Sequence, residues 1–115
     1  MLRAYYYFQL VYIYGWPYND QAHPRASSPG VPLILSPDLQ DAPSARSTVE
    51  QVYDQITQDL QSGIALLEEA GVNGGAVRLS PAAANLLASR VYLYMEEWAL
   101  AKAHAGAVLA DKSSL

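Results

Sequence analysis

The carboxyl groups with the clearest potential for acid–base chemistry are two pairs of neighbouring glutamates, Glu68–Glu69 and Glu96–Glu97. Two carboxyl groups can act as general acid and general base when their surroundings separate their pKa values. Neighbouring residues on a helix do not face each other, however, and both pairs fall at expected helix ends, where water solvates the charges. We therefore interpret both pairs as surface charges rather than as a catalytic pair.

The two histidines, His23 and His104, are the nitrogen ligands that a metal site would need. His23 lies in a Pro-rich stretch and His104 lies among alanines, and a metal site would require them to meet beside a carboxylate. The chain has no cysteine, which removes thiolate ligands and a cysteine nucleophile. We expect no metal and no other cofactor, with His23 at the surface and His104 half-buried.

Trp16 and Tyr18 are the candidate ligand-binding residues. They stand where the first apolar stretch passes into a loop, and flat aromatic faces in such a place can stack on sugar rings. Most aromatic side chains at such positions instead pack against the core or hold a loop in place.

Four helices are expected to position these groups, at about 2–14, 48–69, 81–95 and 97–110, with a long loop at 16–46. Six of the seven prolines fall in that loop, too many for a helix. Within it, "VPLIL" is expected to be a short extended piece. The first stretch is apolar around its whole circumference, and its Tyr, Val and Ile content favours a strand, whereas its length favours a helix.

The starts of the second and third helices carry capping signals. Ser47 and Glu50 have the spacing of a capping box, in which each side chain bonds a free backbone N–H of the first turn. Ser80 precedes Pro81, which fits the first turn of a helix because its missing N–H is not needed there. "GVNGG" at 71–75 is expected to close the second helix and form a loop.

The last two helices have the spacing of a tetratricopeptide hairpin. Trp98 is expected in the core, on a stripe of mostly small residues that packs against the preceding helix. One hairpin cannot close a core by itself, because repeats stack on neighbours. We therefore expect the apolar helices at 2–14 and 81–95 to be covered by protein outside these residues. The positions that match the tetratricopeptide pattern are Ser89, Tyr92, Trp98, Ala101 and Ala105, and the stripe comprises Trp98, Ala101, Ala105 and Val108.

Charge and targeting signals narrow the class of partner. The net charge is −4 and the basic residues do not cluster, so nucleic acid is not expected as a partner. The N-terminal "MLRAYYYFQLVYIYG" lacks a small-residue cleavage site and is too short to span a bilayer as a helix, which takes about 20 residues. We interpret it as a buried element.

Taken together, five blocks in order resemble the SusD/RagB family of outer-membrane nutrient-binding lipoproteins. The resemblance implies an all-α, tetratricopeptide-like fold and non-enzymatic binding of a glycan or other nutrient. It also implies a surface-exposed, lipid-anchored position on the cell outer membrane and a TonB-dependent, SusC-like transporter as partner. The ligand would be bound mostly by segments outside this chain. The blocks are "LRAYYYFQLVYIYG", "GVPLIL", "RSTVEQVYDQITQDLQSGIALL", "LSPAAANLLASRVYLYMEEWALAKAHAGAVL" and "ADKSSL".

Family members are several times longer, and they carry a signal peptide and a lipid-modified cysteine before the first block. We therefore expect residues 1–115 to be a single partial domain, an internal fragment of such a protein. Glu96–Glu97 stands where the family commonly has Gly-Asp. The alternative is a small tetratricopeptide-type adaptor that mediates protein–protein interaction, although a peptide groove needs about three repeats and only one hairpin is visible.

Overall fold

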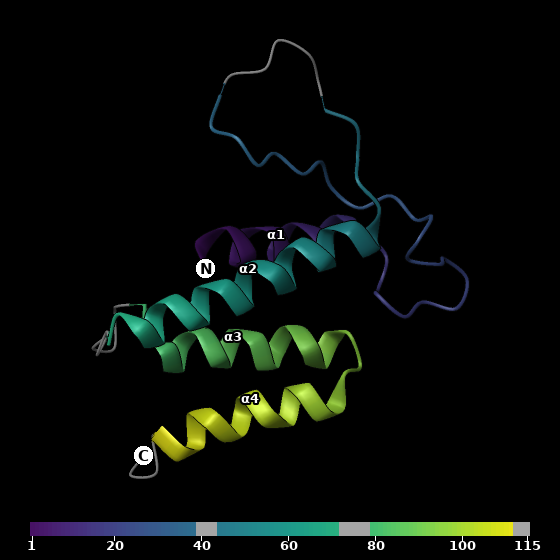
Figure 1. The fold of residues 1–115 in the computed structure, drawn as a ribbon. Coiled ribbons are helices and arrows are strands. Elements are labelled where there is room, and N and C mark those ends of the chain that lie inside the picture. The colour runs from purple at the N-terminus through teal and green to yellow at the C-terminus, as the bar shows by residue number, and fades with distance from the viewer. Residues whose placement is uncertain (39–43, 72–78, 112–115) are drawn as a thin grey trace.

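The computed structural model describes residues 1–38, 44–71 and 79–111. These residues form four α-helices: α1 (Leu2–Tyr14), α2 (Val49–Glu69), α3 (Pro81–Tyr94) and α4 (Trp98–Asp111). Helix α2 packs against both α1 and α3, and α3 packs against α4 (Figure 1). No strand occurs in these three ranges, so the prediction of an all-α protein with about four helices is confirmed. Residues 72–78, which include most of the predicted "GVNGG" loop, lie outside the described part.

Helix α1 is helical despite its strand-forming residue types, because one of its faces packs on α2. Ala4, Phe8 and Val11 recur at helical spacing and are buried. The helix ends at Gly15, whose N–H donates to the carbonyl of Val11 at 2.9 Å. The opposite face keeps large apolar side chains in solvent, and these are Leu2, Tyr5, Tyr6, Leu10, Tyr12, Ile13 and Tyr14.

The capping box of α2 lies one residue later than the sequence predicts. Thr48, not Ser47, accepts from the backbone N–H of Gln51 at 3.2 Å, and the Gln51 side chain accepts from the N–H of Thr48 at 2.9 Å. The prediction of Ser47 and Glu50 was wrong because the backbone of Ser47 is already paired. It accepts from Gly30 at 2.7 Å and donates to Val31 at 3.2 Å.

That pairing closes the long loop near its base, and we call the contact between residues 28–31 and 46–49 the clamp. It contains one antiparallel bridge, between Pro29 and Thr48. The Arg46 side chain donates to the carbonyl of Gly30 at 2.7 Å and to that of Tyr14, at the end of α1, at 3.2 Å. The predicted extended piece thus pairs at its beginning without forming a strand.

Beyond the clamp, the side chain of Tyr7 holds the described part of the loop on α1. The Tyr7 hydroxyl accepts from the backbone N–H of Ile34 at 2.7 Å and donates to the carbonyl of the same residue at 3.0 Å. Tyr7 is a partly buried tyrosine of α1 whose hydroxyl has found a partner, as buried tyrosines usually do.

The hairpin of α3 and α4 forms largely as predicted. Ser80 caps α3 by accepting from the N–H of Ala83 at 3.2 Å. The hydroxyl of Ser89 donates to the carbonyl of Ala101 at 3.1 Å, so the two helices approach closely at small residues. Glu96 has a φ of 60°, a left-handed conformation that favours glycine.

The prediction that Trp98 lies in the core was wrong, because 62% of this residue is exposed. Trp98 is the first residue of α4, and side chains of a helix tilt toward its N-terminus. The indole is therefore directed toward the turn, whereas Ala101 one turn later is buried.

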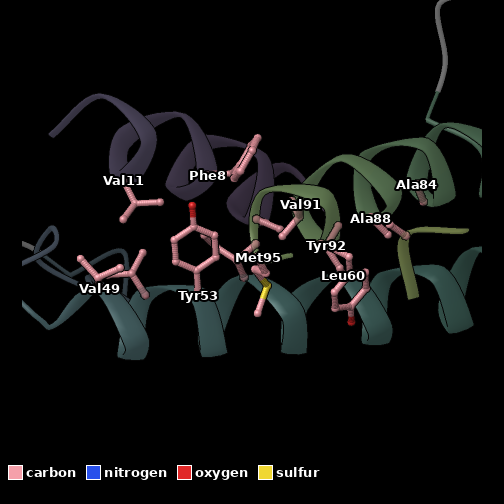
Figure 2. Close-up of a cluster of buried hydrophobic side chains, with 14 of the residues drawn as sticks. Phe8, Val11, Val49, Tyr53, Leu60, Ala84, Ala88, Val91, Tyr92 and Met95 are labelled. Carbon is pink, nitrogen blue, oxygen red and sulfur yellow. The ribbon is translucent and has the colours of Figure 1, made fainter. Parts of the chain in front are cut away.

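The core lies between α1, α2 and α3, with α4 adding little to it (Figure 2). Six apolar residues spaced along one face of α2 supply its base. Both apolar helices nevertheless leave large side chains in solvent: Ile13 of α1 is 64% exposed and Leu86 of α3 is 60% exposed. The described residues thus do not cover these helices, as expected. No helix among them is both long enough and apolar enough to cross a membrane.

An ion pair between α1 and α2 makes stability depend on pH. The guanidinium of Arg3 donates twice to the carboxylate of Asp59, at 2.7 Å each, and Gln55 donates to the same carboxylate at 2.9 Å. The hydrogen bond from Arg3 lowers the pKa of Asp59. Because this pKa is lowered in the folded state, the pair stabilises the fold above the unfolded pKa of about 3.9, and its contribution is lost as the pH falls through the folded value.

We therefore expect Asp59→Asn to lower the free energy of unfolding by about 1 kcal/mol at neutral pH, since one partner is partly exposed. Urea unfolding followed by circular dichroism measures the difference, which should vanish once the pH lies below the folded pKa of Asp59. Asp54→Asn, at an exposed position of the same helix, is the matched control and should change little. A difference that stays constant across this range would contradict the assignment.

Candidate ligand site at the exit of the first helix

Trp16 follows α1 directly and is held by a stacked histidine. The rings of Trp16 and His23 are nearly parallel, at 4°, with centroids 3.5 Å apart. His23 is fixed in turn by Asp20, whose carboxylate lies 2.9 Å from Nδ1 of the imidazole and accepts from the His23 backbone N–H at 2.8 Å. The hydrogen bond from the His23 side chain lowers the pKa of Asp20. One face of the indole is therefore covered, while 47% of Trp16 remains exposed.

Tyr18 is packed more tightly and is fixed on two sides. Its ring meets that of Tyr53 edge-to-face at 4.9 Å, and the Arg25 guanidinium lies 4.4 Å from its centre. Burial raises the pKa of Tyr18, with Arg25 opposing, and burial raises the pKa of Tyr53 to about 12. Both hydroxyls therefore stay protonated at neutral pH and can donate hydrogen bonds.

Asn19 ties this loop to the turn between α3 and α4. Its oxygen accepts from Arg25 at 2.8 Å, and its nitrogen donates to the carbonyl of Met95 at 2.8 Å. The same nitrogen lies 3.4 Å from a carboxylate oxygen of Glu96. The loop after α1 is thus anchored to the far hairpin.

Two adjoining hollows open at this place. The aromatic hollow has a volume of about 170 Å³. The polar hollow has a volume of about 660 Å³, within the usual range of small-ligand sites. Tyr18 forms a wall of both. The aromatic hollow is lined by Val11, Tyr12, Gly15, Trp16, Pro17, Tyr18, Tyr53 and Tyr94, and the polar hollow by Tyr18, Asn19, Asp20, Gln21, Pro24, Arg25, Ala26, Glu50 and Glu96.

The structure brings the two candidate residues together, because Trp16 and Tyr18 line the same aromatic hollow. A contact of either ring with a ligand stays a prediction. Sequence reasoning missed the three tyrosines that share this hollow, Tyr12, Tyr53 and Tyr94, because they come from three different helices and fit an apolar helical pattern. It also missed the polar wall, whose residues carry no motif.

The remaining candidate groups lie apart from this place. His104 stacks on Tyr92 at 5.4 Å, and its Nδ1 lies 2.8 Å from the side-chain oxygen of Asn85, a buried residue of α3. It is half-buried, as expected, and fixes α4 on α3. In the described ranges no three His, Asp or Glu side chains gather as metal ligands do. All four glutamates of the two pairs are exposed.

The fold defines a class: an all-helical protein with a tetratricopeptide-like hairpin, whose two hollows are lined by aromatic and hydrogen-bonding side chains. Comparison with known proteins then specifies the family. A SusD-like family model described as "Starch-binding associating with outer membrane" matches residues 1–93. The chain belongs to this SusD-like family. A search of the curated proteins found no significant match.

Solved structures of the SusD superfamily have the same arrangement. A SusD superfamily protein from Bacteroides thetaiotaomicron is 33% identical over 94% of this chain, with a TM-score of 0.78. Another from Bacteroides vulgatus is 30% identical over 96% of the chain, with a TM-score of 0.81. A SusD-like carbohydrate binding protein from Bacteroides vulgatus shares the fold at 23% identity over 99% of the chain, with a TM-score of 0.78. The chain spans 22%, 24% and 24% of these three proteins respectively.

Proposed function

We propose that the protein carrying this chain captures a glycan or similar nutrient at the surface of the outer membrane, without catalysis, and delivers it to a TonB-dependent transporter. The family description, starch-binding and associating with the outer membrane, supports this proposal. The observation that carries it is the aromatic hollow at the end of α1, where a half-exposed Trp16 adjoins hydrogen-bonding side chains.

The proposed mechanism is non-covalent and uses both hollows. A sugar ring has an apolar face that stacks on an aromatic ring and an edge of hydroxyl groups that exchange hydrogen bonds. Trp16 offers the exposed aromatic surface, and His23 holds the indole in place so that little side-chain freedom is lost on binding. Tyr18, which lines both hollows, offers a hydroxyl for the polar edge.

The proposal also includes the location of the protein at the outer membrane. A lipid anchor in the full-length protein would keep it at the outer membrane, and a SusC-like transporter would receive the nutrient. The helical hairpin of α3 and α4, whose outer surface includes the exposed Trp98, is the part we assign to scaffolding and to contact with the transporter.

The binding proposal is tested by Trp16→Ala in the complete gene product. We expect affinity for a soluble glycan to fall about tenfold, the loss typical of an aromatic anchor. Affinity electrophoresis against starch, dextran and inulin, followed by calorimetry on any glycan that binds, measures the change. Trp98→Ala is the matched control, since it removes the other tryptophan, which is also well exposed but lies on the hairpin turn.

Equal losses in the two variants would contradict the assignment of the site, and absence of binding to every glycan would contradict the proposed function. Co-purification from membranes tests the partner. A TonB-dependent barrel protein should accompany the tagged gene product, and its absence would contradict the delivery step.

A further inference from the structure

The polar hollow carries an unequal set of charges. Asp20, Glu50 and Glu96 line it with carboxylates, and Arg25 is the one cation in its wall among the described residues. At neutral pH the wall therefore has two more negative than positive groups, since three carboxylates face one guanidinium.

The single cation is already engaged by the protein. The guanidinium of Arg25 lies 4.4 Å from the centre of the Tyr18 ring and donates through one nitrogen to Asn19 at 2.8 Å. Its Nε is buried and lies 3.7 Å from a carboxylate oxygen of Glu50, close enough for an ion pair but too far for a hydrogen bond. Arg25 is thus held in place by Tyr18, Asn19 and Glu50, and its single positive charge is outnumbered by the three carboxylates of the wall.

Asp54 and Glu97, which do not line the polar hollow, add negative charge near Tyr18. Burial is the main cause that raises the pKa of Tyr18; the charges of Asp54, Glu50 and Glu97 raise it further, and that of Arg25 lowers it. Tyr18, which lines both hollows, thus has carboxylates of α2 and of the turn before α4 near it, together with the Arg25 guanidinium.

We propose that the polar hollow is a saccharide subsite that accepts uncharged glycans and rejects acidic ones, with Glu50 and Glu96 as the residues that determine this specificity. This proposal rests on the proposed function of glycan binding. The hydroxyls of an uncharged sugar can donate to the carboxylates in charge-assisted hydrogen bonds, which are stronger than neutral ones. A uronate or sulfate group would instead meet like charges in a partly enclosed site, which is an efficient way to exclude a competing ligand.

The test compares matched pairs of polymers on the complete gene product: starch, dextran and inulin, each with its carboxymethylated form. For the pair whose neutral member binds, we expect the carboxymethylated member to bind more weakly at low salt. Glu50→Gln and Glu96→Gln should each reduce the ratio of neutral to acidic affinity by about two- to fivefold, the size expected for a partly exposed charge. Glu68→Gln, at an exposed position near the other end of α2, is the control and should leave the ratio unchanged.

Salt provides a second readout that a structural effect of the substitutions would not imitate. At an ionic strength of about 1 M the screening length falls to about 3 Å, so the unmodified protein should lose most of its preference for the neutral polymer.

Binding of a neutral polymer together with equal or tighter binding of its carboxymethylated form would overturn the charge selectivity and leave the proposed function standing. An unchanged ratio in both glutamine variants would also overturn it. Failure of every polymer to bind would overturn the proposed function and this inference together.

Discussion

Phe8→Ala is expected to lower the free energy of unfolding by about 3–5 kcal/mol, the usual cost of deleting a fully buried aromatic side chain. Only 1% of Phe8 is exposed, and its ring packs edge-to-face with Tyr94 at 5.3 Å. Phe8 thereby joins α1 to the end of α3, and alanine would leave a cavity between them. A loss of this size is a large part of the stability of a typical domain, about 5–15 kcal/mol.

Urea unfolding at a protein concentration low enough to keep the chain monomeric measures this effect. Tyr6→Ala is the control on the same helix, because Tyr6 is 60% exposed and should change stability by about 0.5 kcal/mol or less. Tyr94 also lines the aromatic hollow, so Phe8→Ala should weaken ligand binding as well. A destabilisation close to that of Tyr6→Ala would show that α1 is not packed as described.

The isolated 115-residue chain is expected to bind a hydrophobic dye strongly and to self-associate. Large contiguous apolar surfaces are uncommon on soluble monomers and promote association. Here α1 and α3 together expose ten large apolar side chains, which are Leu2, Tyr5, Tyr6, Leu10, Tyr12, Ile13, Tyr14, Leu86, Leu93 and Tyr94. Dye fluorescence and sedimentation velocity measure the two consequences.

Substitutions on and off this apolar surface distinguish its effect from that of exposed apolar side chains elsewhere. Ile13→Lys combined with Leu86→Lys should reduce both dye binding and association, whereas Leu66→Lys should do neither. Leu66 is as exposed as Ile13, at 64%, but it stands on α2. A monodisperse chain that does not increase the fluorescence of the dye and that unfolds cooperatively on heating would contradict the prediction.

The helices were largely predictable because their signals are local. The Ser80–Pro81 start of α3 is complete within a few residues, and the apolar face of α2 repeats over twenty-one residues. The cap of α2 was misplaced because its position depends on Gly30 and Val31, which pair with Ser47 from across the loop. The backbone partner of a residue cannot be derived from the neighbouring sequence.

The site was predictable only in part, for a similar reason. Trp16 and Tyr18 stood out because they are aromatic residues at the edge of a loop. The polar hollow needs Asn19 to reach the α3–α4 turn and Arg25 to reach Glu50 of α2, and these contacts depend on the tertiary fold. Trp98 shows the opposite error, because a stripe at helical spacing predicts burial of all its members, whereas the structure buries Ala101 and leaves Trp98 62% exposed.

The clamp makes the middle of the long loop a permissive position for insertions. The clamp, formed by residues 28–31 and 46–49, fixes both ends of the loop segment between them. Trp16 and Tyr18 precede the clamp in the sequence. A longer loop raises the entropic cost of closure only slowly, by about 0.6 kcal/mol for each doubling of its length. An epitope tag or a fluorescent label introduced between Pro37 and Asp38, two exposed residues of this loop, would therefore mark the protein while leaving the aromatic hollow in place.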